Sequence, residues 1–282
     1  MKPAAARLAF ALLATVCAAA AADPRPRFSF AAIADVQYED RPAAGARDYR
    51  ASLPKLDGCV RALNAQKLAF AIQLGDLVDG APAALDAILP VYNRLRAPHY
   101  HVRGNHDPRP VGRPYYEFRR PGWRFIVLDG MDVSVADEAG RRLLQDLRRA
   151  GAPNATEWNG AIGEAEQTWL RDRLRAASQA GERAAVFCHF PVLAAATTPA
   201  HLLWNHEAIV RLLEESPAMA AWFNGHDHRG GYASRNGIHY VTLPGMVESG
   251  GANSFTVVDV YRDRLELRGT GTAPSRTLPL NP

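Results

Sequence analysis

The most informative stretch of the sequence is MAAWFNGHDH, residues 219–228. Its first half, Met219 to Phe223, is a short apolar run of the kind that forms a strand buried on both faces. Its second half, Asn224 to His228, places two histidines two residues apart on a turn, a pattern that packing alone rarely produces. The stretch therefore predicts a buried strand of an α/β sheet that carries a functional site at its carboxyl end.

Other apolar runs along the chain end in the same way. Each is followed at once by side chains that bind metals: Phe28 to Ala34 by Asp35, Leu68 to Leu74 by Gly75-Asp76, Tyr100 to Arg103 by Gly104-Asn105-His106-Asp107, and Ala184 to Cys188 by His189. Ligands of α/β sheets bind at the carboxyl ends of the strands, so we expect these side chains to converge. The glycines allow sharp turns and close approach of the backbone.

Helical patterns alternate with these strands. Apolar residues repeat at helical spacing within Arg50 to Leu63, Glu164 to Ala177 and His206 to Glu215, and Asn205 is the expected N-cap of the third helix. Further strands are predicted over 238–243, 255–261 and 264–268, whereas 108–114 and 135–161 are expected to be surface excursions. The pattern indicates one layered α/β domain over residues 23–282, with a sandwich of sheets between helices.

The residue types at the strand ends fit a metal site. Carboxylate, amide oxygen and imidazole together suit Mn, Fe, Zn or Mg. A single Gly-Asp is usually only a turn, and Gly-Asn-His-Asp is often one. The ordered set, with every member at a strand end, is much more specific.

With these motifs in hand, the chain resembles the calcineurin-like metallophosphoesterases. Their pattern runs Asp-x-His, Gly-Asp-x-x-Asp, Gly-Asn-His-Asp/Glu, His and Gly-His-x-His, and here it spans about residues 28–268. The resemblance implies a four-layer α/β/β/α sandwich. Gln37 stands where most members have histidine, and in this respect the chain is similar to the manganese-dependent ADP-ribose/CDP-alcohol diphosphatase group. The stretches 33–38, 203–205, 225–232 and 267–271 are similar to that group as well.

The resemblance also implies a role for each site residue. The first of two divalent metal ions would be held by Asp35, Gln37, Asp76 and His228, and the second by Asp76, Asn105, His189 and His226. His106 would be the general acid, Asp107 would orient it, and Asp79 would support the loop that carries Asp76. Manganese is the expected metal, because the first position is rich in oxygen ligands; Fe, Zn and Mg are alternatives.

The implied function is hydrolysis of the phosphoanhydride bond of a small nucleotide-type substrate, such as ADP-ribose or a CDP-alcohol. A phosphomonoesterase or a phosphodiesterase of the same fold, acting for example on a cyclic substrate, is the alternative. A purple acid phosphatase is disfavoured, because its metal-binding tyrosine would stand where Val78 or Asp79 stands. An inactive phosphoesterase-like binding protein is the third hypothesis, although only Gln37 departs from the ligand pattern.

The N-terminus reads as a targeting segment. Lys2 and Arg7 precede an apolar run that begins at Leu8, and a run of alanines ends at residue 22. This pattern predicts a signal peptide over residues 1–22. A lipid anchor on Cys17 is disfavoured by Val16. We therefore expect a bacterial protein that is exported, periplasmic or secreted, and that is not membrane-bound after cleavage.

The net charge, the remaining cysteines and the aromatic residues are less informative about function. Removal of residues 1–22 leaves 31 basic and 29 acidic residues, and the arginines are interleaved with acids, so no nucleic-acid partner is expected. Cys59 and Cys188 would remain, and the sequence leaves open whether they pair. Most tryptophans are expected in the core: Trp123, Trp158, Trp169 and Trp222. For Trp204 and Tyr232, core packing and contact with a substrate's base or ribose remain equally open.

Overall fold

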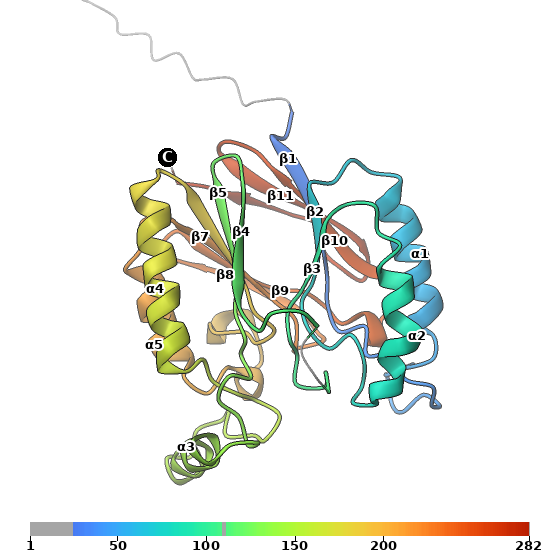
Figure 1. Ribbon diagram of the computed structural model, residues 1–282, viewed down its shortest axis with the longest axis horizontal. Helices are drawn as coiled ribbons and strands as arrows, with labels where there is room; N and C mark the ends of the chain where they lie inside the picture. The colour runs from blue at the N-terminus through green and yellow to red at the C-terminus, as the bar shows by residue number, and fades with distance from the viewer. Residues whose placement is uncertain (1–24, 109–110, 282) are drawn as a thin grey trace, which may run out of the picture.

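The computed structural model describes residues 25–108 and 111–281. Two six-stranded sheets pack face to face, with helices on the outer face of each (Figure 1). The predicted four-layer α/β/β/α sandwich is thereby confirmed. The signal peptide predicted for residues 1–22 lies outside the described residues.

Each sheet combines parallel with antiparallel strands. The first sheet has the order β12-β11-β10-β1-β2-β3, formed by β1 (Phe28–Ile33), β2 (Phe70–Gln73), β3 (His99–His101), β10 (Ser254–Val260), β11 (Arg264–Gly271) and β12 (Arg276–Pro279). The second has the order β4-β5-β6-β7-β9-β8, formed by β4 (Tyr116–Arg120), β5 (Trp123–Val127), β6 (Arg183–Phe187), β7 (Met219–Asn224), β8 (Gly231–Arg235) and β9 (Ile238–Thr242).

Two helices cover each sheet. Helices α1 (Ser52–Asn64) and α2 (Pro82–Tyr92) pack on the first sheet, and α4 (Glu164–Gln179) and α5 (His206–Glu214) pack on the second. Helix α3 (Glu138–Arg149) lies apart from both layers, at the bottom of Figure 1. Three short 3₁₀ turns complete the fold: η1 (Ala194–Ala196), η2 (Pro199–His201) and η3 (Met246–Glu248).

The core explains why the central strands read as continuous apolar runs. On β1, Phe30 and Ala32 face the other sheet, whereas Ala31 and Ile33 face α1 and α2. Successive side chains of a strand point to opposite faces, so a strand covered on both sides is apolar at every position. Between the sheets the core is rich in phenylalanine; the rings of Phe30 and Phe70 stack at 4.7 Å.

The parallel strands bring the predicted site together. Strands β1, β2 and β3 run parallel in the first sheet, and β5, β6, β7 and β9 run parallel in the second. Their carboxyl ends therefore meet at one end of the sandwich, which is also the end from which α3 protrudes (Figure 1).

Some elements were not predicted. Three are edge strands with one paired neighbour each, β4, β8 and β12, and their polar sequences lack a two-sided apolar pattern. Helix α2 was also missed. The predicted excursion over 135–161 contains α3, whose only buried residues are Gly140 and Leu144. Asn205 occupies the N-cap position of α5, but it does not cap the helix; its side chain bonds the backbone of Ile162 instead.

The two cysteines of the described chain are both free and buried. Cys59 on α1 packs on the outer face of the first sheet, and Cys188 packs on the outer face of the second, so they do not pair. Burial raises the pKa of both thiols, which makes them unreactive.

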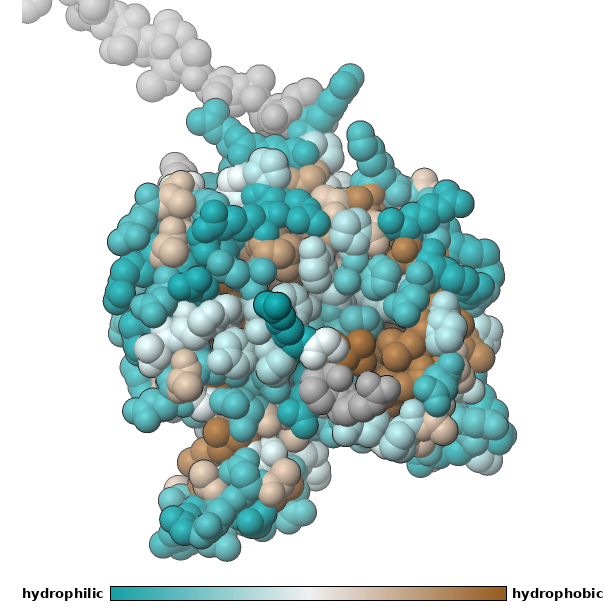
Figure 2. Space-filling model, viewed as in Figure 1, coloured by the Kyte–Doolittle hydropathy of each residue, from teal (hydrophilic) through white to brown (hydrophobic). Residues whose placement is uncertain are grey.

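Hydrophilic side chains cover most of the face shown in Figure 2. Within residues 25–108 and 111–281, no helix is both long and apolar enough to cross a bilayer.

Candidate metal centre

The seven side chains predicted to bind metal lie together at the carboxyl ends of the strands. Each follows a parallel strand: Asp35 and Gln37 follow β1, Asp76 follows β2, Asn105 follows β3, His189 follows β6, and His226 and His228 follow β7. Contacts of 3.5 Å or less link all seven residues into one cluster, and Asp35 joins it by accepting the backbone N–H of His226.

The backbone at this cluster adopts an unusual conformation. Asp35, Gln37, Asp76 and His226 have φ between 43° and 69°, and Asn236 is the only other non-glycine residue of the described chain with a positive φ. Such conformations cost free energy and persist only where the surrounding structure imposes them, often at functional sites. The strain of the described chain is thus concentrated at the predicted ligands.

Glycines allow the ligand loops to approach one another. A Cβ atom on Gly104 would collide with the Asp76 carboxylate, and one on Gly225 would collide with the Asp35 carboxylate. The glycine that precedes Asn105 and the one that precedes His226 are therefore required by close packing of the loops.

Four of the side chains have the spacing of ligands to one ion. Nε2 of His189 lies 3.0 Å from Oδ1 of Asn105, 3.3 Å from Oδ2 of Asp76 and 3.2 Å from Nδ1 of His226. Nitrogen and oxygen ligands lie about 2.0–2.2 Å from a divalent metal, so neighbouring ligands of one ion are about 3–3.4 Å apart. The predicted second metal position fits this spacing.

The first predicted position shares Asp76 with the second. Oδ2 of Asp76 lies 3.1 Å from Nε2 of Gln37, and Nε2 of His228 lies 3.5 Å from Oδ1 of Asp35. The other amide atom, Oε1 of Gln37, is buried without a hydrogen-bond partner. A buried carbonyl oxygen without a partner is costly, and a cation beside it would remove that cost. Because Oδ2 of Asp76 is within 3.3 Å of both Gln37 and His189, it lies between the two positions.

Outer partners determine which nitrogen each histidine offers. The Nδ1–H of His189 donates to the Leu74 carbonyl at 2.9 Å, and the Nδ1–H of His228 donates to Oε1 of Glu248 at 2.9 Å. Both rings therefore present Nε2 to the centre. The sequence did not indicate Glu248, which lies on η3, 20 residues after His228.

His226 is oriented the opposite way. Its Nε2–H donates to Oδ1 of Asn159 at 2.9 Å, which leaves Nδ1 facing His189. Asn159 belongs to the excursion that precedes α4 and is 67 residues from His226 in the sequence. No motif marked it as part of the site.

The charges of the cluster favour a cation. Burial disfavours the charged form of His189, but the Asp76 and Asp35 carboxylates outweigh burial and raise its pKa to about 9. For His228, Asp35 and Glu248 likewise outweigh burial and raise the pKa to about 10. The hydrogen bond from His228 lowers the pKa of Glu248 to about 2. Carboxylates that hold protons on two buried imidazoles will also attract metal ions, which displace those protons.

The two aspartates near His106 have exchanged their predicted roles. Nδ1 of His106 lies 2.7 Å from Oδ1 of Asp79, and Asp79 in turn pairs with Arg41. The predicted orientation of His106 by Asp107 is wrong, because the Asp107 carboxylate turns inward and accepts hydrogen bonds from backbone N–H groups of 76, 77, 78 and 104. Asp107 thus holds the Asp76 loop, whereas Asp79 orients His106.

The aromatic residues also differ from expectation. Trp158 was predicted to be core, yet it is 49% exposed and is the only exposed large hydrophobic residue of the described chain. Trp204 is buried beneath the excursion, and its Nε1–H donates to the Thr156 carbonyl at 3.1 Å, so it is not available to a substrate. Tyr232 bonds His239, and the Arg276 guanidinium covers its ring at 4.0 Å.

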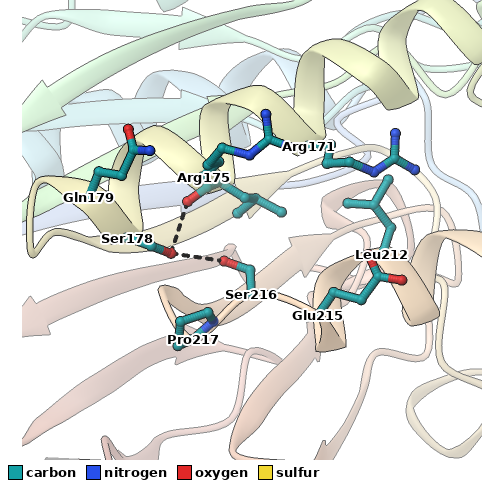
Figure 3. A pocket seen from close by; sticks show the side chains of 9 residues that line it. Arg171, Arg175, Ser178, Gln179, Leu212, Glu215, Ser216 and Pro217 are labelled. Atoms are coloured by element: carbon teal, nitrogen blue, oxygen red, sulfur yellow. Dashed lines mark hydrogen bonds between the residues drawn. The ribbon is translucent and has the colours of Figure 1, made fainter.

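A groove of about 320 Å³ on the outer helical layer is separate from the cluster (Figure 3). It lies between α4, from Arg171 to Gln179, and the end of α5 at Glu215. None of the predicted ligands lines it.

Comparison with known proteins agrees with this geometry. The chain is 31% identical to the manganese-dependent ADP-ribose/CDP-alcohol diphosphatase of Arabidopsis thaliana, over 87% of this chain and 95% of that one. It is 26% identical to the human protein of the same name, over 89% and 92%. A crystal structure of a dimetal phosphatase from Danio rerio superposes with a TM-score of 0.84 at 27% identity, covering 91% of this chain and all of that chain.

The family model of the calcineurin-like phosphoesterases matches residues 28–230, which contain all seven clustered side chains and His106. With both sheets and the ordered strand-end motifs in place, the chain belongs to the calcineurin-like phosphoesterase family.

Proposed function

We propose that this protein is a manganese-dependent hydrolase that cleaves the phosphoanhydride bond of nucleoside-diphosphate-linked substrates such as ADP-ribose or CDP-alcohols. The observation that carries the proposal is the largely buried cluster of seven side chains in which Gln37 replaces the usual histidine. Relatives named for this activity match nearly 90% of the chain, which supports the same conclusion.

The cluster would hold two metal ions. Asp35, Gln37 and His228 would bind the first, the remaining three side chains Asn105, His189 and His226 would bind the second, and Asp76 would serve both. Two such ions activate water and neutralise phosphoryl oxygens. The carboxylate and amide oxygens of the first position favour Mn over softer ions.

His106 is the proposed general acid. Its side chain is 31% exposed, so a substrate can reach it, and its Nε2 lies 4.0 Å from Oδ2 of Asp76. The Asp79 carboxylate lies 2.7 Å from the other ring nitrogen, Nδ1. This arrangement turns Nε2 toward the reacting centre, where it would donate a proton to the leaving phosphate oxygen.

A substrate screen tests the proposal. Purified protein with Mn²⁺ should hydrolyse ADP-ribose and CDP-choline with higher kcat/KM than cyclic nucleotides or p-nitrophenyl phosphate. The products should be two phosphomonoesters, for example AMP and ribose 5-phosphate. A preference for the chromogenic monoester or for a cyclic nucleotide would instead identify a phosphomonoesterase or a phosphodiesterase. Absence of any hydrolysis would favour a binding protein.

Gln37 should determine the choice of metal. The Gln37→His variant replaces an oxygen ligand by nitrogen, so we expect the best activator to shift from Mn²⁺ toward Zn²⁺ or Fe²⁺. The measurement is an activation series with each metal on both proteins. An unchanged order of metals would show that residue 37 does not set metal choice.

Trp158 should contribute to recognition of the base. It is exposed and directly precedes Asn159, which contacts His226. Base–aromatic stacking contributes about 1–3 kcal/mol. We therefore expect Trp158→Ala to lower kcat/KM for CDP-choline by about 5–150-fold, with little change for p-nitrophenyl phosphate. An equal loss for both substrates would contradict a stacking role.

We also propose that the protein is exported from a bacterial cell. The pattern of residues 1–22 supports this, with two basic residues, an apolar run and a run of small residues. N-terminal sequencing of the protein recovered outside the cytoplasm should show cleavage near residue 22, whereas an intact N-terminus would refute it.

A further inference from the structure

We propose that Asn159 is a positioning residue that fixes the tautomer of His226 and thereby sets the affinity of the second metal position. The inference rests on the proposed metal centre and extends it to a residue outside the family's motifs.

Hydrogen-bond partners fix the orientation of the Asn159 side-chain amide. Its side chain is completely buried. The Nδ2 group donates to the carbonyl oxygen of Asn154 at 3.0 Å and to that of Ala200 at 2.8 Å. Since both N–H donors have acceptors, the amide does not turn over, and Oδ1 faces Nε2 of His226 at 2.9 Å.

This orientation leaves one tautomer for the ring. An amide oxygen only accepts hydrogen bonds, so Nε2 of His226 must carry the proton. In a neutral imidazole the lone pair is then on Nδ1, the atom that lies 3.2 Å from Nε2 of His189. The lone pair is thus directed at the second metal position before any ion binds.

The support for Asn159 does not depend on His226. The excursion is fastened to the loop before α5: the N–H of Trp204 donates to the Gly160 carbonyl at 2.7 Å, and Nδ2 of Asn154 donates to the Leu203 carbonyl at 2.9 Å. Trp204 also packs with Leu144 and Ala161 in a small apolar cluster. The contacts between the excursion and the loop before α5 therefore keep Asn159 in place, as a preorganised ligand site requires.

Calorimetric titration of metal-free protein with Mn²⁺ tests the inference without any substrate. Mutation of a residue that hydrogen-bonds to a metal ligand typically lowers the metal affinity by about 10–100-fold. Asn159→Ala should therefore weaken one of two Mn²⁺ sites by about that factor and leave the other unchanged. Two sites of wild-type affinity in this variant would overturn the inference.

Two further variants separate positioning from general loosening of the excursion. Asn154→Ala removes bonds to Leu203 and Trp204 but none to His226, so it should weaken Mn²⁺ binding clearly less than Asn159→Ala does. A loss equal to that of Asn159→Ala would overturn the inference.

Asn159→Asp keeps an accepting oxygen and loses both donors, so it should lower Tm yet retain both Mn²⁺ sites. This variant decides the matter even if Asn159→Ala does not fold; a weakened Mn²⁺ site in Asn159→Asp would contradict it.

Failure of the proposed function is a separate outcome. A protein that binds two Mn²⁺ ions but hydrolyses no nucleoside diphosphate would refute the proposed substrate class, and the dependence of binding on Asn159 would still be measurable.

Discussion

The variant His106→Ala is expected to hydrolyse ADP-ribose about 10²–10⁴-fold more slowly than the wild type, while still binding two metal ions. The leaving phosphate oxygen gains charge as its bond breaks, and His106 is the partly exposed imidazole placed beside Asp76 to protonate it. Its side chain is not among the seven that make up the cluster, so its loss should leave the metal content unchanged. Turnover under saturating substrate and elemental analysis of the same sample measure the two effects.

The leaving group provides the control for His106. A p-nitrophenyl phosphodiester releases an acidic phenol that departs without protonation, so the loss in His106→Ala should shrink with this substrate. The Asp79→Asn variant should resemble His106→Ala in direction, because the carboxylate that lies 2.7 Å from Nδ1 is weakened as a partner. An equal loss for good and poor leaving groups would show that His106 acts in some other way.

The second large effect is expected at Asp76. Asp76→Asn replaces the one carboxylate that contacts both predicted metal positions, so metal content should fall below two per chain. Metal-ion catalysis supplies several kcal/mol of transition-state stabilisation, which corresponds to a loss of about 10³-fold or more in turnover. Asparagine tolerates the left-handed backbone at this position, where φ is 57°, so the change is chemical and not conformational.

A matched exposed carboxylate controls for loss of charge. Asp146 lies on α3 with a largely exposed side chain paired to Arg149. Asp146→Asn should leave metal content and turnover unchanged, because exposed ion pairs contribute little. Asp76→Asn with two tightly bound ions and normal turnover would contradict the bridging role.

The central strands were predictable because they are buried on both faces. Phe28–Ile33 and Met219–Asn224 are apolar at nearly every position for that reason, and a motif follows each of them directly. The edge strands β4 and β8 pair on one side only, and their sequences mix polar with apolar residues, so periodicity did not reveal them.

The ligands were predictable, but their supports were not. Asp35, His189 and His226 stand in local motifs at strand ends, which a single sequence displays. Asn159 and Glu248 reach the centre through tertiary folding alone, across 67 and 20 residues. Local spacing carries no information about such contacts.

The exchange of Asp79 and Asp107 has a similar origin. Adjacency in Asn-His-Asp suggested that Asp107 contacts His106. Successive side chains in a loop often point to different sides, and Asp107 turns back to bind the N–H groups of the Asp76 loop. Asp79, three residues beyond Asp76, reaches His106 because the two loops lie side by side.

The most direct test of the central claim is a titration of metal-free protein with Mn²⁺, with hydrolysis of ADP-ribose followed at each step. If two ions at the Asp76 cluster perform the chemistry, the metal-free protein is inactive and activity rises to its maximum as the second Mn²⁺ per chain is bound. Chelator then abolishes it again. Full activity in protein shown by elemental analysis to contain no metal would contradict the account.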